Sequence, residues 1–245
     1  MGMRSISRFS RRIDAQRPPL TDRTSLAALA LAALSIPPLW CFADAWIAEA
    51  MTRLDPSVTG FFQSITFLGK SAGYLVGSAL LALGFLLWAR RPGIAARDRY
   101  RAIWRGEAAL YVLSVVAAAG IVINIIKPLV GRMRPVKLLS EGQYGIEPGS
   151  LDYALRSFPS GHATTVFALA FALGALWPRF RWVFALLALP VAASRVAITA
   201  HFMSDVVAGA LVGIVTALVL RRIFAHYRIA FRAEGKGYRL PAYAD

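Results

Sequence analysis

Three short segments of this sequence combine histidines with basic and acidic residues in a pattern suited to chemistry on a phosphate ester. His201 and Asp205 are four residues apart, so if a helix begins at His201 the two side chains share one face and the carboxylate can orient the imidazole. A neutral, oriented imidazole is a suitable nucleophile, and a second imidazole, that of His162, can protonate the departing oxygen. His201, His162 and Asp205 are therefore the candidate catalytic residues.

A second group of residues is suited to binding the phosphate itself. Lys127, Arg134 and Arg195 supply three cations, and the two guanidinium groups can hold phosphate oxygens bidentately. The backbone amides of Ser160 and Gly161, at the expected start of a helix, add donors and a favourable dipole. Taken singly, such residues have simpler explanations, including a snorkelling lysine, a capping serine or a structural His–Asp pair. Together they predict a phosphoryl-transfer site.

Other ionisable and metal-binding residue types add little to this site. The outward-facing connections hold no carboxylate cluster suited to a metal ion, so we expect neither a metal nor another cofactor. The single cysteine, Cys41, has no partner for a disulfide. His226 follows the last apolar run among arginines, on the side away from the candidate site, and we expect no catalytic role for it.

The elements that must position these residues are membrane-spanning helices. Of the 245 residues, 57% are hydrophobic, which is more than a soluble domain of this size carries. About 20 mostly apolar residues cross the hydrocarbon core as a helix, and six such runs can be placed. The expected fold is therefore an all-α, polytopic membrane protein with six transmembrane helices. Their approximate ranges are 24–43, 71–89, 107–128, 161–177, 181–199 and 204–222.

The net charge of +15 is distributed in blocks that follow this topology. Arginines precede the first run, separate the second from the third and the fourth from the fifth, and follow the last. Basic residues in alternate connections are typical of loops that face the cytoplasm. The charge therefore has a sufficient topological cause, and we interpret it as evidence for cytoplasmic termini and not for nucleic-acid binding.

The same topology divides the chain into a membrane domain and two tails. Residues 1–23 and 223–245 are expected to be basic cytoplasmic tails around a six-helix domain at 24–222, whose catalytic core spans 124–210. The outward-facing connections are 44–70, 129–160 and 200–203. The first of these contains nothing obviously catalytic, whereas residues 136–156 are positioned to contact the substrate's headgroup.

The three chemical segments resemble the signature of the type 2 phosphatidic acid phosphatase superfamily. Its motifs are Lys-x6-Arg-Pro, Pro-Ser-Gly-His and Ser-Arg-x5-His-x3-Asp. Every fixed position is matched here, in the segments Lys127 to Arg134-Pro135, Pro159 to His162, and Ser194-Arg195 to His201 and Asp205. The resemblance covers roughly residues 124–210. It implies a metal-independent enzyme with His201 as the nucleophile, His162 as the acid, and a phosphate bound by the lysine and two arginines.

The resemblance also implies a location and a range of activities. It predicts a multi-pass enzyme of the bacterial inner membrane, with the lipid bilayer as its solvent, an active site facing the periplasm and a lipid phosphate as its substrate. Polyprenyl diphosphate, lipid A, phosphatidylglycerophosphate and phosphatidic acid remain open as substrates, as does the oligomeric state. Two other functions remain open: a phosphotransferase that uses another lipid or a sugar as acceptor, and a lipid-phosphate binder or flippase without turnover. The six apolar runs disfavour the soluble haloperoxidase branch.

Overall fold

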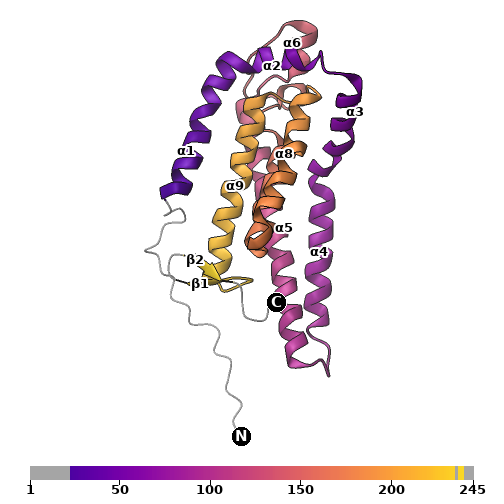
Figure 1. The fold of residues 1–245 in the computed structure, drawn as a ribbon, viewed down its shortest axis with the longest axis vertical. Helices are drawn as coiled ribbons and strands as arrows, with labels where there is room; N and C mark the ends of the chain where they lie inside the picture. The colour runs from indigo at the N-terminus through magenta and orange to yellow at the C-terminus, as the bar shows by residue number, and fades with distance from the viewer. Residues whose placement is uncertain (1–22, 235–236, 240–245) are drawn as a thin grey trace.

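The fold is a bundle of long helices with one end specialised by short helices and loops (Figure 1). The computed structural model describes residues 23–234 and 237–239. The expected tail at residues 1–23 thus lies, apart from Arg23, outside the described residues, as do 235–236 and 240–245 of the second tail. The long helices are α1 (Arg23–Pro38), α4 (Ser71–Trp88), α5 (Ala96–Val130), α7 (Gly161–Leu176), α8 (Arg181–Ala197) and α9 (Met203–His226).

Shorter elements connect these helices. A π-helical turn, Leu39–Ala43, leads from α1 into α2 (Asp44–Met51), and α3 (Pro56–Ile65) is followed by a 3-10 turn at Thr66–Gly69. Beyond α5 come α6 (Pro135–Glu141) and a 3-10 turn at Tyr153–Leu155, and a further 3-10 turn, Pro178–Phe180, precedes α8. After α9, strands β1 (Arg232–Glu234) and β2 (Gly237–Arg239) pair antiparallel.

The expected all-α membrane fold is confirmed, with a correction to the spans. Within the described residues, five helical segments are long and apolar enough to cross a membrane: Leu29–Met51, Pro56–Trp88, Ala96–Val130, Pro178–Ala197 and Met203–His226. The sixth expected span is α7, an apolar helix of only 16 residues. It packs against α5, α8 and α9, so neighbouring helices cover much of its surface.

The first span continues further than its hydropathy suggested. It was expected to end at residue 43, but the helical path passes through the π turn after Pro37 and Pro38 and continues to Met51. Proline removes backbone donors, and a π turn is one way in which a helix absorbs that loss. Asp44 therefore lies inside an apolar helical segment and not in a loop.

Aromatic residues tie the last helix to the bundle. Tyr111 of α5 is fully buried, packs edge-on against Phe224 and Phe231, and donates a hydrogen bond to the carbonyl oxygen of Ala217. Phe231 is itself buried. The chain therefore remains part of the core beyond residue 222, where the membrane domain was expected to end.

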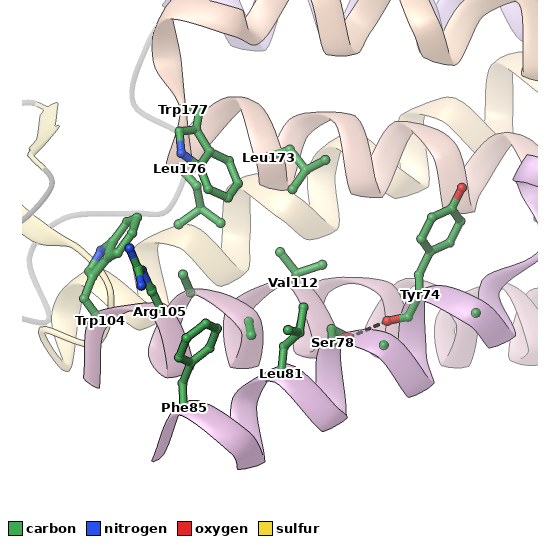
Figure 2. Close-up of a pocket in the computed structure, with 14 residues that line it drawn as sticks. Tyr74, Ser78, Leu81, Phe85, Trp104, Arg105, Val112, Leu173, Leu176 and Trp177 are labelled. Atoms are coloured by element: carbon green, nitrogen blue, oxygen red, sulfur yellow. Dashed lines mark hydrogen bonds between the residues drawn. The ribbon is translucent and has the colours of Figure 1, made fainter. Parts of the chain in front are cut away.

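The two ends of the bundle differ in character. The α4–α5 connection and the C-terminal end of α9 lie at one end, and α2, α6 and the start of α9 at the other (Figure 1). An apolar cavity of about 570 Å³ runs between α4, α5 and α7, with Tyr74 near one limit and Trp104 and Trp177 near the other (Figure 2). The predicted phosphate site lies at the end that carries α2 and α6.

Candidate active site

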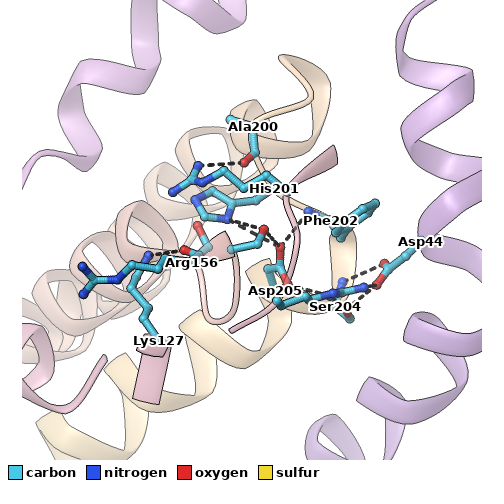
Figure 3. A network of polar contacts seen from close by, with 12 residues as sticks. Asp44, Lys127, Arg156, Ala200, His201, Phe202, Ser204 and Asp205 are labelled. Atoms are coloured by element: carbon cyan, nitrogen blue, oxygen red, sulfur yellow. Dashed lines mark hydrogen bonds and ion pairs between the residues drawn. The ribbon is translucent and has the colours of Figure 1, made fainter. Parts of the chain in front are cut away.

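His201 lies in the turn before α9 and faces the carboxylate of Asp205. Its Nδ1 is 3.5 Å from Oδ2 of Asp205, which also accepts the backbone N–H of Phe202 at 2.9 Å (Figure 3). The pairing was expected from a helix beginning at His201, but α9 begins at Met203. The carboxylate instead reaches back from the first turn of α9 to the preceding residues. With Nδ1 facing Asp205, Nε2 is the ring nitrogen left for chemistry.

The surroundings of His201 keep its imidazole neutral. The side chain is only 3% exposed, and burial lowers its pKa to about 3. The hydrogen bond to Asp205 and the charge of that carboxylate act in the opposite direction, while Arg134 and Lys127 lower the pKa further. Desolvation outweighs the neighbouring carboxylate because a buried imidazolium loses its hydration. A neutral imidazole is the form that can act as a nucleophile.

Ser157 is a part of this site that the sequence analysis overlooked. Its hydroxyl is fully buried, donates to Oδ2 of Asp205 at 2.5 Å and lies 3.4 Å from Nδ1 of His201. Its partner lies 48 residues away in the sequence, a separation that sequence spacing does not disclose.

Arg134 is held by backbone carbonyl groups on two sides. Nε donates to the carbonyl oxygen of Tyr153 at 2.9 Å, and Nη1 donates to that of Ala200 at 3.1 Å. The guanidinium group also stacks over the ring of Tyr153, 3.8 Å from the centroid. Burial lowers the pKa of Arg134, although a guanidinium group stays charged in a protein. These contacts hold the cation immediately beside the His201 turn.

The other two predicted cations lie near the C-terminal ends of two long helices. Lys127, one turn before the end of α5, donates to the carbonyl oxygen of Arg156 at 3.1 Å (Figure 3). Arg195, in the last turn of α8, is 8% exposed and donates to the hydroxyl of Thr66 at 2.6 Å. Both side chains are therefore anchored by one contact each.

Both imidazoles border the same cluster of cations. The charges of Lys127 and Arg134 act on His201, and the same two charges, together with those of Arg195 and Lys70, act on His162. Because electrostatic effects fall off with distance, both rings lie within the range of the same two cations. The predicted catalytic and phosphate-binding side chains are thus brought together.

The start of α7 differs in detail from the expectation. The backbone N–H of Ser160 donates to the carbonyl oxygen of Asp205 at 2.9 Å. This amide was predicted to bind the phosphate, but it is already occupied. Among the side chains that the structure describes, the Ser160 hydroxyl is one of a few that are buried without a hydrogen-bond partner. Gly161 is the first residue of α7, where amide groups lack intrahelical acceptors. The hydroxyl and the Gly161 amide are therefore the donors left at this position.

The connection at 44–70, in which nothing obviously catalytic was expected, contacts residues of the site. Thr66 binds Arg195, and Gly69 packs so closely on the ring of His162 that a Cβ atom there would collide with it. Asp44 is fully buried and forms an ion pair with Arg132, which in turn pairs with Asp205. Neither Asp44 nor Arg132 was among the predicted site residues.

Comparison with known proteins places these features in a family. The sequence profile of the PAP2 superfamily matches residues 108–228. A lipid A 1-phosphatase of Rhizobium johnstonii is 32% identical over 180 residues, which cover 72% of each chain. The chain belongs to the PAP2 superfamily. A lipid A 1-phosphatase of Rhizobium etli is 33% identical to this PAP2 protein over 59% of it and 62% of the relative.

Solved structures support the same placement at the level of the fold. A transmembrane PAP2-type phosphatidylglycerolphosphate phosphatase from Bacillus subtilis aligns with a TM-score of 0.56 and 20% identity, covering 80% of this chain and 94% of the other. LpxE of Aquifex aeolicus aligns with a TM-score of 0.54 and 22% identity, covering 75% and 98%. The resemblance based on the three motifs is confirmed, and this PAP2 protein is a membrane-embedded phosphatase.

Proposed function

We propose that this PAP2 protein hydrolyses the phosphate group of a membrane lipid through a phosphohistidine intermediate on His201. The observation that carries the proposal is the neutral, buried imidazole, held through Nδ1 beside Asp205 and bordered by Lys127 and Arg134. A site that only bound lipid phosphate would have no use for an oriented nucleophile.

In the first step, the Nε2 lone pair of His201 attacks phosphorus and the bond from phosphorus to the lipid oxygen breaks. Burial and the neighbouring cations lower the pKa of His162 to about 4, and the negative charge of the bound phosphate opposes this shift. The protonated His162 donates its proton to that lipid oxygen, so the lipid leaves as an alcohol, or as a monophosphate if the substrate is a diphosphate. Lys127, Arg134 and Arg195 compensate the charge on the non-bridging oxygens. Asp205 stabilises the positive charge that develops on the imidazole ring.

In the second step, water attacks the phosphohistidine. His162, now neutral, takes the proton from the water as its oxygen bonds to phosphorus. The bond from phosphorus to Nε2 breaks, inorganic phosphate leaves, and His201 returns to its neutral form. The net reaction consumes one water per phosphate released and restores both imidazoles to their starting states.

Two observations support a lipid as the substrate, and lipid A as the first to test. Both curated relatives are lipid A 1-phosphatases. The apolar cavity between α4, α5 and α7 begins at Gly73, one helical turn beyond Gly69, the residue that packs on His162. An acyl chain lying there would leave its phosphate close to the site. Polyprenyl diphosphate, phosphatidylglycerophosphate and phosphatidic acid are the alternatives to compare.

We place the active site on the periplasmic side of the bacterial inner membrane, with both termini in the cytoplasm. The arginine-rich connection between α4 and α5 lies at the end of the bundle opposite α2 and α6. Positive charge marks the cytoplasmic side of such proteins. Cysteine-labelling of single-cysteine variants in intact cells measures this orientation directly.

The mechanism is tested with purified full-length protein in detergent micelles. Phosphate release from the four lipids is compared for the wild type, His201→Ala and His162→Ala, with His226→Ala as the control for a histidine outside the site. We expect His201→Ala to release no phosphate and to form no acid-labile phosphoenzyme. His162→Ala should lose most activity with poor leaving groups, and His226→Ala should match the wild type.

The outcomes separate the proposal from its alternatives. Normal turnover by His201→Ala contradicts the mechanism, and lipid binding without phosphate release by the wild type indicates a binder. Transfer of labelled phosphate to an added alcohol in preference to water indicates a transferase. Among the described residues, no three His, Cys, Asp or Glu side chains are grouped to hold a metal ion, and we expect full activity in excess chelator.

A further inference from the structure

Behind the proposed nucleophile lies a buried chain of charges, of which Asp44 and Arg132 are outside the PAP2 motifs. Arg132 is 1% exposed and bridges two carboxylates that are both fully buried. Its Nη2 is 2.7 Å from Oδ2 of Asp44, and its Nη1 is 2.6 Å from Oδ1 of Asp205. Figure 3 shows the two carboxylates, Asp44 and Asp205. Burial opposes the charged form of Arg132, but Asp205 and Asp44 together raise its pKa. The two short ion pairs favour the charged form of the guanidinium group between the carboxylates.

Aromatic rings fix the orientation of this guanidinium group. It lies 3.6 Å from the ring centroid of Trp40 and 4.4 Å from that of Phe202. Nη2 also donates to the hydroxyl of Tyr144 at 2.8 Å, and that hydroxyl donates to the carbonyl oxygen of Trp40. A planar guanidinium group can stack and bridge in this way, whereas the compact ammonium group of lysine cannot.

Asp44 also binds the start of the helix that carries Asp205. Its Oδ1 accepts the backbone N–H of Ser204 at 3.0 Å, and its Oδ2 accepts the hydroxyl of the same serine. Nη1 of Arg132 contacts the Ser204 hydroxyl at 2.6 Å. A residue from the first membrane segment thereby helps to fix the first turn of α9, 160 positions later in the chain.

We infer that Asp44 and Arg132 are positioning residues for the phosphohistidine chemistry, acting on His201 through Asp205. The inference rests on the proposed function. Two carboxylates and one guanidinium group leave one net negative charge behind the imidazole, which becomes positive when it attacks phosphorus. Removing the charge of Asp44 leaves the buried cluster neutral. The transition state then loses stabilisation that the neutral ground state did not need, so kcat should fall more than KM rises.

The inference is tested with Asp44→Asn, which removes the charge and nearly preserves the shape. Glu49→Gln is the matched control, because Glu49 is exposed on the same helix, α2. Dioctanoyl phosphatidic acid in detergent micelles serves as the probe substrate. We expect Asp44→Asn to lower kcat and the rate of phosphoenzyme formation at least tenfold, with KM within about twofold of the wild-type value. Glu49→Gln should leave both constants unchanged.

A second variant tests the bridge itself. Arg132→Lys keeps the positive charge but cannot reach both carboxylates while stacking on Trp40, so we expect a similar loss of kcat. Rates are normalised to folded protein, measured by monodispersity and thermal midpoint. If Asp44→Asn does not fold, the rate of phosphoenzyme formation in Arg132→Lys decides the question.

The outcomes distinguish failure of the positioning role from failure of the proposed function. A kcat for Asp44→Asn within twofold of the wild type, or a change confined to KM, overturns the positioning role. A loss that disappears after normalisation to folded protein overturns it as well. Absence of phosphate release by the wild type across the lipid panel would instead overturn the proposed function.

Discussion

Removing Arg132 should destabilise the protein strongly, because Arg132 is the cation shared by two buried carboxylates. Arg132→Leu leaves Asp44 and Asp205 buried, negatively charged and without their shared cation. Loss of one partner from a buried ion pair typically costs about 3–5 kcal/mol, because the remaining charge keeps its desolvation penalty. We expect Arg132→Leu to reduce the free energy of unfolding by an amount in that range.

The cause can be isolated by a double-mutant cycle. Asp44→Asn alone should cost about 1–3 kcal/mol, because it weakens a charge-assisted hydrogen bond to Arg132. In the Arg132→Leu background the same change removes an unpaired charge, so the double variant should be more stable than Arg132→Leu alone. The exposed pair of Lys137 and Glu141 provides the control: Lys137→Leu should leave stability almost unchanged.

Unfolding in mixed micelles of dodecylmaltoside and sodium dodecyl sulfate, followed by tryptophan fluorescence, measures these differences. If the two costs simply add in the double variant, the carboxylates are not coupled through Arg132 and the electrostatic reasoning is wrong. An Arg132→Leu protein as stable as Lys137→Leu would refute it more directly.

Three further predictions concern the remaining features of the site. Gly77 lines the apolar cavity, and a Cβ atom there meets no protein atom within 4 Å. Gly77→Leu should therefore occupy part of the cavity and reduce activity on long-chain lipids more than on short-chain ones, whereas Gly84→Leu, outside the cavity lining on the same helix, should not. Chain-length profiles of kcat/KM test this. Gly69→Ala should displace the ring of His162 and lower kcat, seen as a loss that is largest with poor leaving groups. The pKa of His201 lies near 3, below that of an unfolded histidine, so the native state should lose stability as pH falls from about 6.5 towards 3. NMR of 15N-labelled histidine should then show a neutral ring above pH 4, and a titration near 6.5 would contradict it.

The local parts of the site were predictable because their residues lie close together in sequence. Arg195, His201 and Asp205 fall within eleven positions, and short spacing constrains how far apart side chains can be. The predicted convergence of these residues with Lys127 and Arg134 depended on membrane topology, since helices that cross in alternate directions return selected ends to one face. The resulting cluster has the composition that the motifs indicated.

The details that were wrong depend on where a helix begins. His201 and Asp205 were expected to share a helical face, yet α9 begins two residues after His201. The carboxylate of Asp205 accepts a hydrogen bond from the backbone N–H of Phe202, because N–H groups at the start of a helix have no intrahelical acceptor. The amide of Ser160 is likewise occupied by the carbonyl oxygen of Asp205. Helix boundaries are uncertain by a few residues from sequence alone, and each such shift changes which donors remain available.

Asp44 could have been found by a stricter physical reading of the first apolar segment. Ending that span at residue 43 made the carboxylate look like the start of a loop, where it needs no explanation. A carboxylate inside an apolar helix is costly unless a partner compensates it. The arginine-rich blocks have a topological cause, but Arg132 lies in a connection that was predicted to face outward, where that cause does not apply. A buried acid and an unexplained arginine on the same side of the membrane are reason to expect an ion pair, and here that pair is also bonded to the carboxylate behind the proposed nucleophile.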